Sequence, residues 1–172
     1  FCVAMDSIFV SVYQDVPNAT FTSNNFCNGD LTEFNGNSGL TTVNNSYIWS
    51  FGQNGKEVST LLEVGNNNII LIVENLDNSC KDTIQEYITV FSNPAANFSF
   101  SNVCIGESLF FSDSSFNDII SWSYDFNDGV GYSIDPNPIY TYESSGIYNV
   151  SLDVISDVGC KDSVIKQVIV YE

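Results

Sequence analysis

Five cysteines, at positions 2, 27, 80, 104 and 160, are the residues of this chain that can form covalent cross-links. Cys27 and Cys104 each begin a Cys-x-Gly-acid sequence, and Cys80 and Cys160 each begin Cys-Lys-Asp. Because both kinds recur, the simplest prediction is two disulfides, Cys27–Cys80 and Cys104–Cys160, which leave Cys2 unpaired. Buried reduced thiols are the alternative, and zinc is disfavoured because the chain has no His and no Cys-x-x-Cys pair. Disulfides imply an oxidising compartment outside the cytosol.

The chain is acidic, with 21 Asp and Glu residues against 4 Lys and Arg residues and a net charge of −17. Carboxylate oxygens suit calcium, and four carboxylates lie close together in sequence: Asp118, Asp125, Asp128 and Asp135. The matching stretch earlier in the chain has Ser50 and Asn54 instead, and no EF-hand spacing is present. We therefore predict no cofactor and favour turn-forming side chains in a solvated loop, with Asp125 and Asp128 as the calcium candidates.

Several kinds of chemistry are disfavoured by residue types that the chain lacks. There is no His to act as a base for a Ser or Cys nucleophile, and all four basic residues are Lys, so no guanidinium can clamp a phosphate. Nothing singles out a pair of carboxylates for glycoside hydrolysis. So acidic a surface repels nucleic acid and anionic membranes, and no apolar stretch approaches the roughly 20 residues of a membrane span. We predict a non-enzymatic protein that binds no nucleic acid and does not insert into a membrane.

The cysteines belong to an internal repeat. A Val followed by an aromatic residue lies ten positions after three of the five cysteines, and Pro17 and Pro94 recur with the spacing of Cys27 and Cys104. We predict the last strand of a preceding repeat followed by two complete repeats, at 1–16, 17–93 and 94–172. The chain then reads as a piece of a longer array whose neighbouring repeats are its partners. Ordering of the first segment by a neighbour would indicate a filament.

Hydrophobic and polar residues alternate along much of the chain, as in 120–126 and 148–154, which is the pattern of half-buried strands. Clusters of Asn and Gly separate these stretches as turns, and no segment has a convincing helical pattern. Several short strands in each repeat predict an all-β sandwich. Some aromatic residues could stack on sugars, but their alternation with Ser favours core packing: Tyr47, Trp49, Trp122 and Tyr124.

Three stretches of the second repeat follow a known pattern: Tyr124-Asp-Phe-Asn-Asp-Gly129, Pro138-Ile-Tyr-Thr-Tyr142 and Gly146-Ile-Tyr-Asn-Val-Ser-Leu-Asp-Val154. They resemble the polycystic-kidney-disease (PKD) domain, whose runs are Trp-Asp-Phe-Gly-Asp-Gly, Pro-x-His-x-Tyr and Gly-x-Tyr-x-Val-x-Leu-x-Val. This chain departs from the pattern at Tyr124, Asn127 and Tyr140, where the family has Trp, Gly and His. In the first repeat only the opening of the pattern is similar, at Trp49-Ser-Phe-Gly52, so its assignment depends on the cysteines.

The resemblance implies two tandem immunoglobulin-like β-sandwiches that act as spacers or as adhesion or protein-binding modules. The combination of Cys-x-Gly-Glu early and Gly-Cys-Lys-Asp late is similar to tandem repeats of large bacterial surface adhesins. Such proteins are often exported by the type IX secretion pathway, and some serve gliding motility. The resemblance thus implies a disulfide-pinned extended spacer or adhesion array at the cell surface, with surface glycans or proteins as further partners. The alternative is a glycan- or protein-binding module appended to a secreted enzyme.

A last pattern is also similar to a known signal. Asp6-Ser7-Ile8, Asp82-Thr83-Ile84 and Asp162-Ser163-Val164 recur at the same place in the repeat and resemble the Asp-Ser/Thr-aliphatic O-glycosylation signal of bacteria with that export route. Ser7, Thr83 and Ser163 are therefore the O-glycosylation candidates, and the protein would be a glycoprotein. The alternative is that Asp and Ser or Thr simply begin a strand there.

Overall fold

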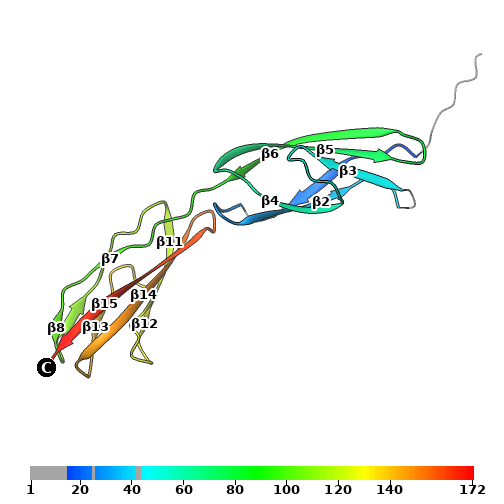
Figure 1. The fold of residues 1–172 in the computed structure, drawn as a ribbon. Helices are drawn as coiled ribbons and strands as arrows, with labels where there is room; N and C mark the ends of the chain where they lie inside the picture. The colour runs from blue at the N-terminus through cyan, green and yellow to red at the C-terminus, as the bar shows by residue number, and fades with distance from the viewer. Residues whose placement is uncertain (1–14, 25, 42–43) are drawn as a thin grey trace, which may run out of the picture. The chain divides into compact units, whose positions relative to one another are not determined.

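The computed structural model describes residues 15–24, 26–41 and 44–172 (Figure 1). They divide into two compact units, of which the first ends at Val90 and the second is Phe91–Glu172; we call them unit 1 and unit 2. Every regular element among the described residues is a β-strand, which confirms the all-β prediction. Residues 1–14, which include Cys2, Ser7 and most of the predicted first strand, lie outside the described residues.

Unit 1 consists of two three-stranded antiparallel sheets, with strand orders β1-β2-β4 and β3-β5-β6. Side chains of alternate residues in β2 are buried, as the sequence pattern predicts for a strand with one solvated face. The strands are β1 (Thr20–Ser23), β2 (Leu31–Asn37), β3 (Asn45–Trp49), β4 (Glu57–Leu61), β5 (Gly65–Asn75) and β6 (Lys81–Val90).

The core of unit 1 lies between its two sheets. Phe34 comes from β2, and Trp49 and Leu71 come from β3 and β5 of the other sheet; each is at most 2% exposed. The ring centroids of Phe34 and Trp49 are 5.3 Å apart, so the two layers contact each other through aromatic side chains. The indole N–H of Trp49 donates to the carbonyl of Gly55 at 2.9 Å, which satisfies the polar atom of this buried ring. These two facing layers form a β-sandwich.

Unit 2 has a five-stranded sheet of order β12-β11-β14-β15-β8, in which only β8 runs parallel to its neighbour, and two strand pairs, β13-β9 and β10-β7. The short strands are β7 (Phe98–Ser99), β8 (Val103–Cys104), β9 (Ser108–Phe110), β10 (Ser112–Asp113), β12 (Tyr132–Ser133) and β13 (Ile139–Thr141). The long strands are β11 (Ile119–Asp125), β14 (Gly146–Ser156) and β15 (Lys161–Tyr171).

The core of unit 2 is built on the alternation of β14. Val150, Leu152 and Val154 point inward and are 0% exposed. Phe98 from β7 lies opposite the large sheet, and its ring centroid is 5.6 Å from that of Tyr124 on β11. The predicted immunoglobulin-like sandwich is therefore confirmed, with the long strands in one layer and the short strand pairs covering it.

The turn that follows Cys27 is reproduced after Cys104. In both turns the N–H of the residue three positions later donates to the cysteine carbonyl at 3.1 Å. The glycine of each turn has a positive φ, 86° at Gly29 and 78° at Gly106. Glycine adopts this conformation without the steric cost that a Cβ would add, which explains why Cys-x-Gly recurs.

The turn before the last strand is one residue longer in unit 1 than in unit 2, but the same backbone contact closes both turns. The N–H of Asn75 donates to the carbonyl of Cys80 at 2.9 Å, and the N–H of Ser156 donates to the carbonyl of Cys160 at 2.8 Å. The two members of each cysteine pair therefore occupy equivalent places in the two folds.

The chain comes into unit 1 at one end and leaves it at the other. The side chain of Asn75, at the end of β5, donates to the carbonyl of Asp15 at 2.8 Å, so the incoming chain lies beside the β5–β6 turn. From that turn β6 runs ten residues to Val90. At about 3.3 Å per residue this strand spans roughly 33 Å.

Unit 2 is organised in the same way. The side chain of Asn117, just before β11, donates to the carbonyl of Ser92 at 3.2 Å, and the N–H of Asp157, just after β14, donates to the carbonyl of Asp118 at 2.9 Å. The incoming chain thus lies at the end where β15 begins. Because β15 has 11 residues, it leads the chain roughly 36 Å away. We call the two ends of each unit its incoming and outgoing ends.

Replacing Leu152 with Ala should destabilise unit 2 by about 2–5 kcal/mol, because the truncation leaves a cavity between the layers. Ile165→Ala removes a side chain that is 67% exposed and should change stability by less than about 0.5 kcal/mol. Urea unfolding followed by Trp122 fluorescence, in a Trp49→Phe background, measures both. Equal effects of the two substitutions would contradict this description of the core.

Candidate functional site

The four cysteines among the described residues are in two chemical states. Cys27 and Cys160 are disulfide-bonded, whereas Cys80 and Cys104 have free thiols. The disulfides Cys27–Cys80 and Cys104–Cys160, predicted from the repeat, are therefore not those of this structure. A disulfide fits an oxidising, extracellular location.

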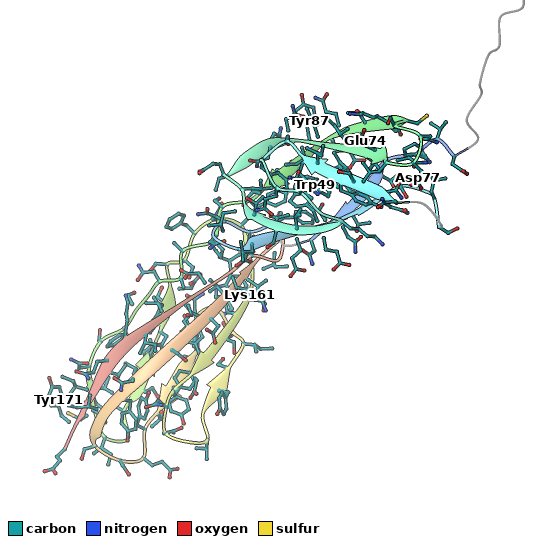
Figure 2. The ribbon with its side chains drawn as sticks, turned by 45° about the vertical axis from the view of Figure 1, so that its right-hand side comes forward. Trp49, Glu74, Asp77, Tyr87, Lys161 and Tyr171 are labelled. Atoms are coloured by element: carbon teal, nitrogen blue, oxygen red, sulfur yellow. The ribbon has the colours of Figure 1, made fainter. Side chains whose placement is uncertain are left out.

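Strand length explains why Cys104 and Cys160 cannot pair. Cys160 immediately precedes β15, whereas Cys104 is the register partner of Tyr171 at the other end of that strand. Figure 2 labels Lys161 and Tyr171, which lie at opposite ends of unit 2. The roughly 36 Å spanned by β15 far exceeds the distance of about 7 Å within which two Cα atoms must lie for a disulfide.

The cysteines of unit 1 are separated in the same way. Cys27 lies in the turn just before Leu31, the first residue of β2. Cys80 lies just before β6, where the carboxylate of Asp82 accepts a hydrogen bond from the N–H of Ala19 at 2.7 Å. Ala19 comes just before β1. The first residue of β1, Thr20, pairs with Asn37, which is the last residue of β2 and lies at the other end of that strand from Leu31. The two cysteines therefore lie at opposite ends of a seven-residue strand, roughly 20 Å apart.

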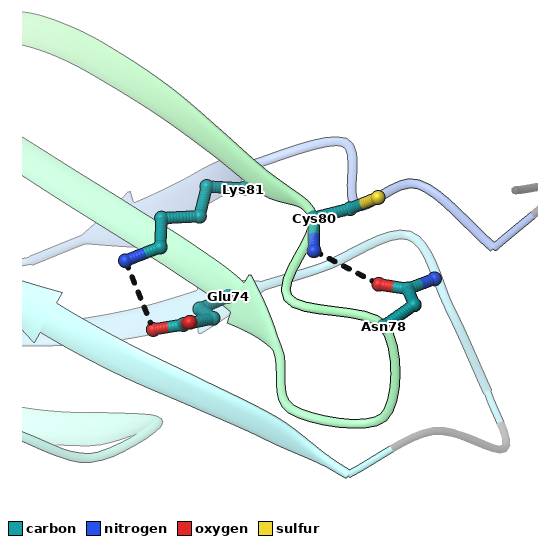
Figure 3. Close-up of polar contacts among 4 residues, drawn as sticks. All are labelled: Glu74, Asn78, Cys80 and Lys81. Atoms are coloured by element: carbon teal, nitrogen blue, oxygen red, sulfur yellow. Dashed lines mark hydrogen bonds and ion pairs between the residues drawn. The ribbon is translucent and has the colours of Figure 1, made fainter.

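Cys80 is held in the turn between β5 and β6 (Figure 3). Its N–H donates to the side-chain oxygen of Asn78 at 2.9 Å, and in the strands beside it the Nζ of Lys81 is 3.2 Å from a carboxylate oxygen of Glu74. The sulfur points away from this ion pair. Cys80 is half-buried and Cys104 is exposed, so solvent reaches both free cysteines.

Asp125 and Asp128, the calcium candidates, hold the loop that follows β11. Asp125 accepts a hydrogen bond from the N–H of Asn127 at 2.8 Å. One oxygen of Asp128 accepts from the N–H groups of Val130 and Gly131, at 3.1 and 2.8 Å. Within the described ranges there is no group of three or more His, Cys, Asp or Glu residues that could hold a metal ion. The observed role of these two carboxylates is to form turns.

Tyr140 donates a hydrogen bond to the other carboxylate oxygen of Asp128. Burial, this hydrogen bond and the negative charge of Asp128 raise the pKa of Tyr140 to about 12. Partial burial raises the pKa of Asp128, but the hydrogen bonds from Tyr140, Gly131 and Val130 outweigh it, and the net shift is downward. A Cβ at Gly131 would overlap the Tyr140 hydroxyl, so this contact requires a glycine. Tyr140 thus stabilises the loop at the position where the PKD pattern has His.

The Asp of each Cys-Lys-Asp sequence joins the last strand to the incoming chain. Asp82 accepts from the N–H of Ala19 at 2.7 Å, and Asp162 accepts from the N–H of Ala96 at 2.8 Å. A carboxylate that binds a backbone N–H is a favourable charge-assisted contact. This structural role accounts for the recurrence of Asp at the start of the strand.

The described O-glycosylation candidates follow these aspartates directly. Thr83 and Ser163 are both exposed, so their hydroxyl groups are accessible to a modifying enzyme. Ser7 lies outside the described residues.

The aromatic residues considered as sugar platforms are core residues. Trp49 is 2% exposed and Tyr124 is 0% exposed. Tyr47 and Trp122 are half-buried and pack against the cores of unit 1 and unit 2. The prediction of core packing is confirmed.

One groove of about 500 Å³ lies over β1, β2 and β4 of unit 1. Its polar side chains pair with each other: Asn24 donates to Glu33 at 2.9 Å, and Asn35 donates to Glu57 at 3.1 Å. It contains hydrogen-bonding groups but no nucleophile paired with a base, which acid–base or covalent catalysis would require.

Comparison with known proteins finds a family match within unit 2. Residues 92–170 match the PKD domain family. PKD domains are typically non-catalytic structural or binding modules. No curated protein matches the chain in sequence. In the part of the chain that the structure describes, no helix is long and apolar enough to cross a membrane.

Solved structures of PKD domains are similar to part of the chain. The PKD1 domain of Vibrio anguillarum Epp is 28% identical, over 46% of this chain and 94% of that one, with a TM-score of 0.42. The PKD1 domain from Vibrio cholerae metalloprotease PrtV is also 28% identical, over 46% and 99%, with a TM-score of 0.42. A structure of carbohydrate-binding modules from the β-sandwich superfamily is 30% identical, over 46% of this chain and 35% of that one, with a TM-score of 0.43.

Tyr140→Phe should lower the stability of unit 2 by about 1 kcal/mol at pH 8, because it removes the hydrogen bond to Asp128. The raised pKa of Tyr140 means that its contribution is complete below pH 10 and is lost as pH rises towards 12. The difference between the two proteins should therefore shrink over that interval, measured by urea unfolding with Trp122 fluorescence in a Trp49→Phe background. Tyr132→Phe, on a side chain that is 69% exposed, is the control. A difference that stays constant up to pH 12 would argue against the Tyr140–Asp128 contact.

Proposed function

We propose that this chain is a spacer and adhesion segment of a secreted cell-surface protein, made of repeats at 17–93 and 94–172. The observation that supports this most directly is the position of the chain ends within each unit. The chain comes in where the last strand begins and leaves where it finishes. Each unit therefore carries the chain forward by roughly 33–36 Å. A module that returned its two ends to one side would add no such reach.

The hydrogen bonding of each unit suits a segment that bears load. In unit 2 the last strand pairs with β14 from Gly146 to Ile155, so a force between the two ends acts along many hydrogen bonds at once. In unit 1, β6 pairs with β5 from Gly65 to Glu74. The contacts of Asp82 and Asp162 with the incoming chain add to this resistance. The disulfide-bonded cysteines also suit a protein that works outside the cell.

The finer role rests on the sequence resemblance. Cys-x-Gly-Glu and Gly-Cys-Lys-Asp in unit 2 are similar to repeats of large bacterial surface adhesins. We assign the parent protein to that class, exported by the type IX pathway and serving attachment or gliding. The net charge of −17 keeps like-charged segments apart and discourages collapse of an array.

Replacing the segment within its parent protein tests this role against a binding role. Deleting residues 17–172 should reduce attachment or gliding of cells that make the protein. Inserting two unrelated β-sandwich domains of similar length should restore it, because a spacer contributes distance and not a specific surface. Surface labelling of intact cells confirms that each version is displayed. A replacement that is displayed but inactive would show that the exposed faces bind a glycan or protein ligand.

We also propose that Thr83 or Ser163 carries an O-linked sugar in the native protein, since both hydroxyl groups are exposed after an Asp at the start of a strand. Peptide mass spectrometry of protein from its own cells should find a glycan mass on at least one of them, and Thr83→Ala or Ser163→Ala should remove it. Thr89, which is exposed on the same strand as Thr83 without a preceding Asp, should be unmodified. Unmodified peptides at Thr83 and Ser163 would leave Asp82 and Asp162 with their structural role alone.

A further inference from the structure

The repeat contains two cysteine motifs, and each motif supplies one of the two free cysteines. Cys104 belongs to a Cys-x-Gly-acid turn and Cys80 begins a Cys-Lys-Asp sequence, and the equivalent residues Cys27 and Cys160 are disulfide-bonded. We propose that the thiols of Cys104 and Cys80 are the two halves of a head-to-tail disulfide, with Cys104 of one copy of this chain joined to Cys80 of a second copy.

One backbone hydrogen bond beside each free cysteine recurs beside its bonded equivalent, although the turn at Cys80 is one residue longer than the turn at Cys160. The turns at Cys27 and Cys104 have the same 3.1 Å hydrogen bond from the residue three positions later to the cysteine carbonyl. The turns at Cys80 and Cys160 have matching bonds of 2.9 and 2.8 Å to the cysteine carbonyl. Cys104 therefore lies in the same kind of turn as the disulfide-bonded Cys27, and Cys80 lies just before the last strand of its unit, as the disulfide-bonded Cys160 does.

The partner of each free thiol must lie outside its own unit. Cys104 is at the outgoing end of unit 2, beside Tyr171, whereas Cys160 is at the incoming end. Cys80 is at the incoming end of unit 1, where Asp15 arrives, and Cys27 is at the outgoing end. Disulfide geometry excludes bonds over the length of a unit. A head-to-tail arrangement of two copies brings a cysteine at an outgoing end next to one at an incoming end.

The reaction needs a disulfide oxidant, for which oxidised glutathione serves. The Cys104 thiolate attacks the glutathione disulfide, forms a mixed disulfide and releases one glutathione. The Cys80 thiolate of the second copy then attacks the Cys104 sulfur and releases the other glutathione. Two protein thiols and one glutathione disulfide thus become one protein disulfide and two glutathione molecules. Because copies with a net charge of −17 repel each other, salt should accelerate the reaction by screening that charge.

The experiment uses the full chain with Cys2→Ser, which removes the fifth cysteine from the assay. Incubation with oxidised and reduced glutathione in 0.5 M salt should give a ladder of dimers, trimers and larger species on a non-reducing gel, and dithiothreitol should collapse the ladder to monomer. Peptide mass spectrometry should identify a Cys80–Cys104 linkage. Adding Cys80→Ser or Cys104→Ser should abolish all species larger than the monomer.

Mixing the two single variants provides the matched control. The Cys80→Ser protein keeps Cys104, and the Cys104→Ser protein keeps Cys80, so the mixture should form dimers and nothing larger. Monomers alone in the Cys2→Ser protein would overturn the proposal. So would dimers in either single variant alone, because they would show pairing of identical ends. Circular dichroism verifies that each variant is folded.

This inference deepens the proposed spacer role, but the two fail separately. The disulfide ladder can form even if unrelated β-sandwich domains, displayed in place of residues 17–172, do not restore attachment. Conversely, a replaceable spacer can fail to cross-link.

Discussion

In each unit the last strand runs the length of the sandwich, and the positions of the other functional features depend on it. A strand advances about 3.3 Å per residue, so ten or 11 residues separate its two ends by more than 30 Å. The incoming chain, the Cys-Lys-Asp sequence and the Asp contacts lie at one end. The Cys-x-Gly turn lies at the other end, beside Tyr171 in unit 2. This separation prevents a disulfide within a unit and makes each unit directional.

The carboxylates and the tyrosine hydroxyl described next form hydrogen bonds that stabilise the fold. Asp82 and Asp162 bind N–H groups of the incoming chain, and Asp125 and Asp128 bind N–H groups of their own loop. The hydroxyl of Tyr142 donates to the carbonyl of Phe126 at 2.9 Å inside the core. Carboxylates that are already occupied by backbone donors have fewer oxygen lone pairs left for a metal or a substrate.

The elements of the fold were largely predictable because burial imposes a period of two on a strand. Val150, Leu152 and Val154 revealed β14 in this way, and they are fully buried. The sequence also showed that Cys-x-Gly recurs, but it did not show that these residues form a turn whose glycine has a positive φ. The cysteine pairing was not predictable from the repeat alone, because a repeated position says nothing about which end of a strand it occupies. Only the register of β8 against β15 places Cys104 next to Tyr171 and away from Cys160.

The contact between Tyr140 and Asp128 was missed for a related reason. The two residues are 12 positions apart and come from β13 and the loop after β11, and nothing in the spacing links them. The sequence showed Tyr140 only as a departure from the PKD pattern. In the structure, Gly131 leaves the space that the Tyr140 ring requires, so the departure is accommodated by a glycine that the pattern did not single out. Such compensation depends on distance in space, which a motif comparison does not contain.

The charge of the chain bears on how copies of it can associate. A net charge of −17 opposes contact between copies, and only 4 basic residues are present to offset it. A non-covalent joint between like-charged ends must overcome this repulsion at every encounter and weakens when salt is diluted. A disulfide needs one productive encounter and afterwards holds the joint independently of ionic strength. Cys80 provides a free thiol at the incoming end of unit 1, and Cys104 provides another at the outgoing end of unit 2. For copies with so acidic a surface, a disulfide between these thiols is a more durable joint than a non-covalent contact.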